Sequence, residues 1–98
     1  MKYDKLFADF EGRSVSELHG DICYADWDGM HSVKYDTWDW MMIIWHKFRD
    51  LKFKEETKSK LHTNYVARLA QDLAYGTIDE FCHNISIAIY WYNSQSVV

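Results

Sequence analysis

The chain has 98 residues, of which 48% are apolar and 17% aromatic, and its formal net charge is −4. This composition indicates one folded domain, residues 1–98, and excludes a disordered chain. The mild negative charge disfavours general DNA binding, which needs a basic face, and no apolar run approaches the ~20 residues of a membrane span.

The first predicted element is a short helix that ends near Gly12. Apolar side chains recur at helical spacing before this glycine, at Tyr3, Leu6, Phe7 and Phe10. Residues 18–35 lack that spacing and alternate apolar and polar side chains around Asp28-Gly29, a dipeptide typical of hairpin turns. The pattern predicts a small β-hairpin or an irregular extended region there.

A second predicted helix spans about residues 37–51 and contains the segment Trp38-Asp39-Trp40-Met41-Met42-Ile43-Ile44-Trp45-His46-Lys47. A helix that is apolar around most of its circumference has to be surrounded by protein, so we expect this one at the centre of the domain. Its main buried stripe would consist of Trp38, Met41, Met42, Trp45 and Phe48, with Trp40, Ile43 and Ile44 on the flanks.

A third helix is predicted from about Glu55 to Gly76, with an apolar face formed by Leu61, Tyr65, Val66, Leu69 and Leu73. The sequence Thr77-Ile78-Asp79-Glu80 has the form of a capping box and predicts the start of a fourth helix. Its inward positions would be Ile78, Phe81, Cys82, Ile85, Ala88, Ile89 and Tyr92. The predicted fold class is therefore mainly α, about four helices with a small hairpin near residues 18–35, and α+β is the alternative.

Three segments occur together in a recognisable order. The chain opens with a helix that ends in Phe10-Glu11-Gly12, continues with Trp38-Asp39-Trp40-Met41-Met42 and a lysine at position 47, and closes on Trp91-Tyr92-Asn93. In this order they resemble a group of small tailed-phage and prophage proteins. The resemblance implies a phage origin and a compact domain. Those relatives have more strand-like middles and usually a proline where this chain has Ile43, and the helical pattern of residues 55–75 here departs from them and argues against α+β. The resemblance implies no site, because the group has no established activity.

No motif of a catalytic or phosphate-binding site occurs in the sequence, so we expect neither an enzyme nor a cofactor. Asp79 and His83 are spaced to pair as base and orienter, although a carboxylate in a first helical turn is explained by the helix dipole. Cys23 and Cys82 form no CxxC pair, and the N-terminus lacks the apolar core of a signal peptide. We therefore expect buried, reduced thiols and a cytoplasmic location.

A metal site is the other chemical function that the sequence suggests. His19, Asp21 and Cys23 alternate and would share one face of a strand. Zinc usually needs a fourth ligand, for which His31, Cys82 or His83 would be candidates. The spacing matches none of the familiar ligand patterns, and we therefore expect no metal.

The excess of aromatic residues is the best indication of function. Trp27 lies in a polar turn, Asp26-Trp27-Asp28-Gly29, and Tyr90, Trp91 and Tyr92 are consecutive, so a single neighbour cannot bury all three. Such rings either fill the core and rim of a small domain or form a binding surface, since Trp and Tyr dominate interface hot spots. A final helix that is apolar on two sides would also suit a homodimer.

Charge divides the chain into an acidic and a basic part. Residues 1–40 carry nine acidic and four basic side chains, and residues 41–98 carry six acidic and seven basic ones. The basic residues of 47–60 form either an ordinary solvated face or an anion-binding patch.

We predict a non-enzymatic, phage-type protein that binds a host or phage protein, with a role in host takeover or anti-defence. The alternative is a protein that binds or sequesters a nucleotide, with bases stacked on Trp27 or Trp91 and phosphates held by Lys and Arg of residues 47–60. The residues predicted to bind are Asp26, Trp27, Asp28, Lys52, Lys54, Tyr90 and Trp91.

Overall fold

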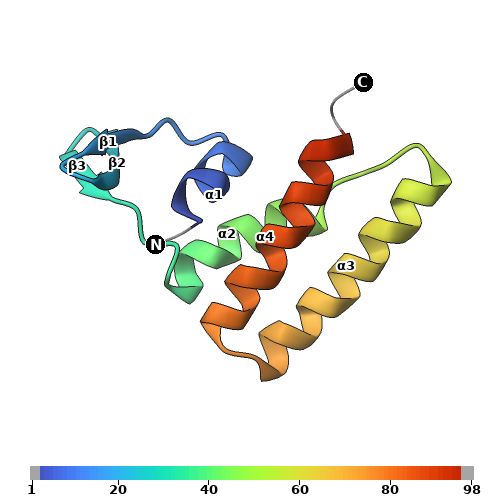
Figure 1. The fold of residues 1–98 in the computed structure, drawn as a ribbon. Helices are drawn as coiled ribbons and strands as arrows, with labels where there is room; N and C mark the ends of the chain where they lie inside the picture. Colours follow the sequence, from blue (N-terminus) through green and yellow to red (C-terminus); the bar gives the residue numbers. More distant parts are fainter. Residues whose placement is uncertain (1–2, 96–98) are drawn as a thin grey trace.

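Four helices and one small antiparallel sheet make up the computed structural model, which describes residues 3–95 (Figure 1). The elements follow in the order α1 (Asp4–Glu11), β1 (Ser16–Leu18), β2 (Asp21–Asp26), β3 (Gly29–Ser32), α2 (Trp38–Arg49), α3 (Glu56–Tyr75) and α4 (Ile78–Gln95). The predicted fold class, mainly α with a small β element, is confirmed. No helix within residues 3–95 is long and apolar enough to cross a membrane.

Helix α1 ends where the sequence predicts, at a glycine in the left-handed conformation. Gly12 has a φ of 80°, which a residue with a side chain adopts only with strain. The N–H groups after the helix donate to the carbonyl oxygens of Ala8 and Asp9 and so satisfy its last turn. The chain then turns toward the sheet, and Phe7, Ala8 and Phe10 remain in the core.

The sheet has the strand order β1-β2-β3, with both neighbouring pairs antiparallel. Cys23 of β2 pairs with Ser16 of β1 and with Ser32 of β3, and it is the one buried residue of the three strands. The predicted hairpin is therefore present as β2 and β3. The additional strand β1 was not predicted, because three residues are too few to show an alternation.

Helix α2 packs against both α1 and α4, as expected for a central element. Met41, Ile44, Trp45 and Phe48 are buried, whereas Ile43 is 45% exposed. The expectation that protein surrounds this helix is thus correct on one side only. Thr37 precedes the helix, but its hydroxyl donates to the carbonyl oxygen of Lys34 at 2.7 Å and does not cap it.

Helices α3 and α4 form an antiparallel pair joined at Gly76. A β-carbon on this glycine would lie 2.9 Å from the carbonyl oxygen of Asp72, so the close turn excludes any side chain. The predicted cap of α4 is present, since the Thr77 hydroxyl accepts the N–H of Glu80 at 3.2 Å. The inward face of α4 also agrees with the prediction, with Phe81, Cys82, Ile85, Ala88 and Ile89 buried.

The first half of α3 differs from the predicted apolar face. Leu61 is exposed, and its neighbour His62 is buried instead. The His62 ring lies between Phe48 and Phe53, and its Nε2 donates to the carbonyl oxygen of Phe48 at 2.7 Å. That carbonyl belongs to the last turn of α2 and also accepts the N–H of Leu51 at 3.3 Å, so His62 gives it a second donor.

Candidate functional site

The tip of the β2–β3 hairpin carries the most exposed aromatic residue of the described chain. Asp26 and Gly29 pair across the strands, which leaves Trp27 and Asp28 as a two-residue loop. The N–H of Asp28 donates to Asp26 Oδ1 at 2.7 Å, and Gly29 adopts a φ of 125°. Backbone and carboxylate thus fix the turn without using the indole.

The indole of Trp27 projects into solvent and is 95% exposed. A tryptophan can bury 150–250 Å² of surface, so leaving it exposed forgoes much of the stabilisation available to so small a domain. Trp is also among the residues that contribute most to protein interfaces. We therefore identify the hairpin tip, defined as Asp26, Trp27 and Asp28, as the candidate binding site, which agrees with three of the seven residues predicted from sequence.

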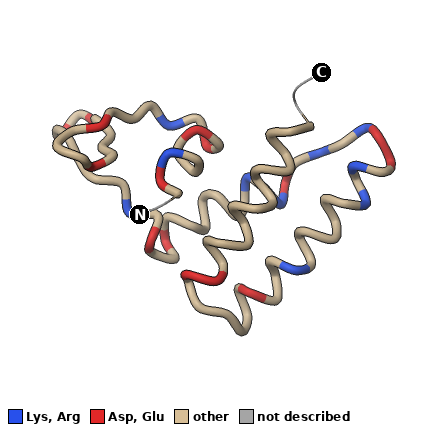
Figure 2. Tube along the Cα trace, in the orientation of Figure 1, with Lys and Arg blue, Asp and Glu red and all other residues tan. Residues whose placement is uncertain are grey.

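The hairpin tip is strongly acidic for its size. Residues 16–32 contain no Lys or Arg and four of the fifteen acidic residues, Glu17, Asp21, Asp26 and Asp28. The remaining residues of the sequence thus carry 15 − 4 = 11 acidic and 11 basic side chains, so the whole net charge of −4 resides in the sheet region. Figure 2 shows the acidic residues of the sheet on one side and a group of basic residues at the α2–α3 connection on the other.

Two neighbouring groups stabilise the ionised form of Asp26. The N–H of Asp28 is the main cause that lowers the pKa of Asp26, and His31 lowers it further through a contact of 3.1 Å between His31 Nε2 and Asp26 Oδ1. Both partners favour the ionised form of the carboxyl group. The tip therefore presents an indole beside a carboxylate that is charged at neutral pH.

The sheet is attached to the helices by a stack of one cation and two aromatic rings. The guanidinium of Arg13 lies 4.8 Å from the centre of the Tyr24 ring and 4.9 Å from that of Trp40. The two rings also contact each other, with centres 5.5 Å apart. Since Tyr24 belongs to β2 and Trp40 to α2, this stack fixes the base of the hairpin on the helical body.

Glu11 holds Arg13 in this stack. Its Oε1 lies 2.9 Å from a terminal nitrogen of Arg13, and its Oε2 accepts a hydrogen bond from the hydroxyl of Tyr35. Burial and this contact with Glu11 raise the pKa of Tyr35, which stays a donor. Sequence reasoning missed the network of Glu11, Arg13 and Tyr35. The only sequence signal was a pair of opposite charges on either side of Gly12.

The other four predicted residues lie away from the tip. The Trp91 ring packs against Phe53 and Tyr65, with centres 5.5 and 5.2 Å apart, and is half-buried. Lys52 and Lys54 flank Phe53 in the sequence and are exposed. These residues therefore share one region, the α2–α3 connection with the end of α4.

Trp27 does not share that region. In Figure 1 the sheet and the α2–α3 connection lie on opposite sides of the helices. Trp27 and the lysines of residues 47–60 therefore do not form one site that could hold a nucleotide. Tyr90 is exposed on α4. It precedes Trp91 in the sequence but does not join the ring contact between Trp91 and Tyr65.

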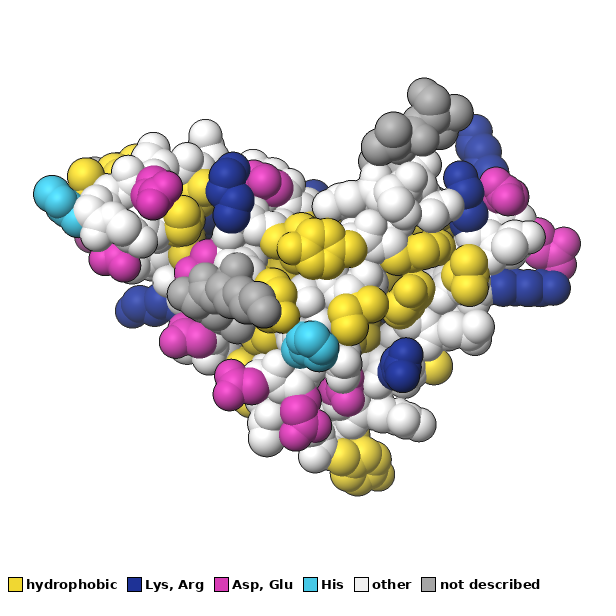
Figure 3. Space-filling view, in the orientation of Figure 1, with side chains coloured by type: hydrophobic (Ala, Val, Ile, Leu, Met, Phe, Trp, Pro, Cys, Tyr) yellow, Lys and Arg dark blue, Asp and Glu magenta, His cyan; other side chains and the backbone are white. Residues whose placement is uncertain are grey.

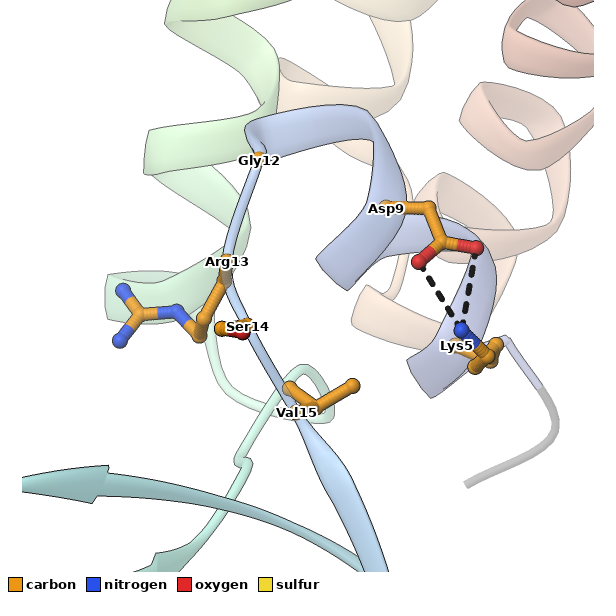
Figure 4. A pocket seen from close by; sticks show the side chains of 6 residues that line it. All are labelled: Lys5, Asp9, Gly12, Arg13, Ser14 and Val15. Atoms are coloured by element: carbon orange, nitrogen blue, oxygen red, sulfur yellow. Dashed lines mark hydrogen bonds and ion pairs between the residues drawn. The ribbon is translucent and has the colours of Figure 1, made fainter.

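An open cleft of about 370 Å³ lies between α1 and β1, lined by Lys5, Asp9, Gly12, Arg13, Ser14 and Val15 (Figure 4). Its two opposite charges neutralise each other, since Lys5 Nζ lies 3.1 Å from Asp9 Oδ1. The Arg13 side chain points away from this pair, toward the stack described above. The cleft therefore offers no unpaired charge to a ligand.

The titratable groups of residues 3–95 do not gather into a metal site, since no three His, Cys, Asp or Glu side chains are placed to share an ion. Both cysteines are unpaired and buried, as predicted. Burial raises the pKa of Cys82 to about 12, which keeps this thiol protonated and unreactive. His83 does not depend on Asp79 for a partner, because its Nδ1 lies 3.0 Å from the hydroxyl of Tyr3.

Comparison with known proteins adds no family to this description. No family model, no curated protein and no solved structure matches the chain. The resemblance to small phage proteins stays a prediction from the sequence.

Proposed function

We propose that this protein acts by binding another protein through the hairpin tip and has no catalytic role of its own. The observation that carries the proposal is the indole of Trp27, which is 95% exposed on a turn that its own backbone holds in shape. A tryptophan side chain has only two rotatable bonds, so it loses little conformational freedom on binding, and it brings a large apolar area.

The charges around Trp27 indicate the chemistry of the partner. Asp26 and Asp28 flank the indole, and residues 16–32 contain no Lys or Arg. A partner pocket that is apolar at its centre and carries Lys or Arg on its rim would complement both features. Such rim charges mainly accelerate association and exclude wrong partners.

The biological setting of this binding is proposed on the resemblance to tailed-phage and prophage proteins. In that setting the partner is a protein of the bacterial host or of the phage, and binding serves host takeover or counters a defence system. Small size and a protruding acidic hairpin are compatible with either role.

The test is a comparative capture experiment. Wild-type protein is immobilised and exposed to a bacterial lysate at moderate salt, in parallel with the Trp27→Ala variant. We expect at least one protein that the wild type retains and Trp27→Ala loses, because truncating a hot-spot tryptophan costs roughly 2–4 kcal/mol of binding. Identical retained proteins in both samples would contradict the proposal.

Tyr75→Ala is the matched control. Tyr75 is 91% exposed and lies at the end of α3, outside the hairpin, so its loss removes an exposed aromatic without altering the tip. This variant should retain the same partner as the wild type. Asp28→Asn, which removes one charge beside Trp27, should weaken capture and make it less sensitive to salt.

The nucleotide alternative is tested separately by titrating tryptophan fluorescence with mono-, di- and cyclic nucleotides. Phe53 and Tyr65 already contact the ring of Trp91, which leaves less of it for stacking. An emission change that depends on Lys52 and Lys54 would support this weaker candidate, and an unchanged emission across the panel would remove it.

A further inference from the structure

A second exposed apolar region lies on the opposite side of the molecule from the hairpin. A pocket of about 200 Å³ opens on α3 and is lined by Leu61, Asn64, Tyr65 and Arg68. Ile87 and Tyr90 of α4 are 45% and 58% exposed. Figure 3 shows hydrophobic side chains gathered over α3 and α4 on this face.

The pairing of the two helices places the pocket on α3 beside Ile87 of α4. Asn84 Nδ2 donates to Asp72 Oδ2 at 2.7 Å, and the rings of Tyr65 and Trp91 lie 5.2 Å apart. These two contacts bracket Arg68 on α3 and Ile87 on α4, which therefore lie at the same level of the antiparallel pair. We call the pocket together with Ile87 the α3–α4 groove. Tyr90 lies outside it, because it is not on the stripe of Asn84, Ile87 and Trp91 that borders α3.

Arg68 gives the groove its charge. Within residues 3–95, no carboxylate forms an ion pair with this guanidinium. Asp72 lies one turn further along α3, but its carboxylate accepts the Asn84 amide. The groove thus combines aromatic and aliphatic walls with a cation that is available to a carboxylate from outside, the partner that a guanidinium binds best.

The size of the groove limits what can occupy it. Small-molecule sites usually enclose about 300–1,000 Å³, so the pocket of about 200 Å³ suits one large side chain better than a nucleotide. A fitting occupant is an aromatic side chain with a carboxylate next to it. The chain itself carries this combination on an exposed turn, Asp26-Trp27-Asp28.

We propose that the α3–α4 groove binds the hairpin tip of a second copy of this chain, with Trp27 in the pocket and Asp26 or Asp28 on Arg68. The charges of the two surfaces are complementary, since residues 16–32 carry four acidic residues and no Lys or Arg, and Arg68 of the groove has no ion pair within residues 3–95. The hairpin and α3 lie on opposite sides of one molecule, so its own tip cannot reach its own groove (Figure 1).

Contact between a tip and a groove is a head-to-tail interaction. Each copy would offer one tip and one groove, so association continues into short chains or closes into a ring. The contact is small, and interfaces well below about 1,200 Å² are weak and transient. Self-association should therefore appear only at high protein concentration and decrease with salt. It also covers Trp27, so it would compete with binding of an outside partner.

Sedimentation velocity on two variants and their mixture tests this inference. Trp27→Ala has an intact groove and no tip residue, and Arg68→Glu has an intact tip and a reversed groove charge. We expect the wild-type mass to rise between micromolar and millimolar protein, and each variant alone to remain a monomer. An equimolar mixture of the two should form a dimer and nothing larger, because only one productive contact is left.

Three results would overturn the proposal: a monomeric wild type throughout this range, association of Trp27→Ala alone, or a mixture that stays monomeric. Tyr75→Ala is the control and should associate like the wild type, since Tyr75 lies in neither surface. Circular dichroism checks that Arg68→Glu is folded. If it is not, Arg68→Gln replaces it and must lose association in the same way.

The outcome is independent of the function proposed above. Arg68→Glu leaves the hairpin tip intact and should still capture an outside partner, whereas Trp27→Ala should lose both activities. A wild-type protein that never self-associates but binds a free acidic, tryptophan-containing peptide in the groove would contradict the proposal. The groove would then bind a segment of another protein and not a second copy of this chain.

Discussion

The sheet and the helical body contain similar residue types but use them in different ways. In the body, the rings of Phe7, Phe48 and Phe81 are fully buried and the helices pack directly on one another. In the sheet, Cys23 is the only buried strand residue, and Trp27, Leu18 and Met30 are exposed. The body therefore supplies most of the folding free energy, and the sheet supplies little.

A region that buries few apolar side chains must be stabilised by other contacts. Three strands without a buried face are marginally stable unless they pack on another element. Here the attachment is the stack of Tyr24, Arg13 and Trp40, held by Glu11. The difference between the two regions indicates that the body is built for stability, and that the sheet is a presented surface fixed at its base.

The largest effect should come from breaking the body. Trp45→Ala removes a buried indole that contacts Phe81, and we expect a loss of roughly 3–5 kcal/mol in the free energy of unfolding. Thr77→Ala removes only a helix cap and should cost about 1 kcal/mol. Urea denaturation measures both. Equal losses would mean that α2 is not the centre of the stable region.

The second effect should fall on the connection between the regions. Arg13→Ala removes the cation that contacts both rings and leaves Glu11 with one partner fewer, and we expect a cost of about 2 kcal/mol. Native-state hydrogen exchange should show faster exchange in β2 and β3 than in α4, because the sheet loses its attachment first.

Arg13→Lys is the matched control for this connection. It keeps the charge but lacks the planar group that covers both rings, so its exchange should be intermediate. Equally faster exchange in the sheet and in α4 would show that the sheet does not open separately from the helical body.

The body was more predictable from sequence than the connection. Helix ends at Gly12 and Thr77 and the buried face of α4 follow local rules of spacing and capping, and the structure agrees with them. The turn at Asp28-Gly29 is equally local. The exposure of Trp27 was indicated by its two acidic neighbours, which are poor candidates for burial.

The errors have tertiary causes. The spacing of apolar residues predicts Leu61 on the buried face of α3, but the His62 ring packs between Phe48 and Phe53 and donates to the Phe48 carbonyl oxygen, which also accepts the N–H of Leu51. Arg13 contacts one ring from β2 and one from α2, and no spacing within one segment shows that encounter. The chemistry of single turns was therefore readable from the sequence, and contacts between distant segments were not.

Alkaline pH should weaken the body. The pKa of Cys82 is raised by burial from 9.0 to about 12, and that of Tyr35 is also raised, by burial and by Glu11. Above about pH 9 the unfolded chain releases protons that the folded chain still holds, so the free energy of unfolding falls as pH rises. The slope is at most about 1.4 kcal/mol per pH unit for each group.

Urea denaturation at a series of alkaline pH values measures this slope. Cys82→Ala should flatten the part of the curve that begins near the ordinary thiol pKa, and Tyr35→Phe should flatten the part at higher pH. A wild-type curve that stays level above about pH 9 would mean that the two groups ionise as readily in the folded chain as in the unfolded one.

The smallest effect on stability should come from the hairpin tip. Trp27 is 95% exposed, and the turn depends on the Asp28 N–H, the Asp26 carboxylate and Gly29. Trp27→Ala should therefore change the free energy of unfolding by no more than about 0.5 kcal/mol. Quenching of tryptophan fluorescence by acrylamide, which is neutral and not repelled by Asp26 and Asp28, should lose its most accessible component in this variant. A large loss of stability would place Trp27 in the fold, and the hairpin would then have to be regarded as part of the body.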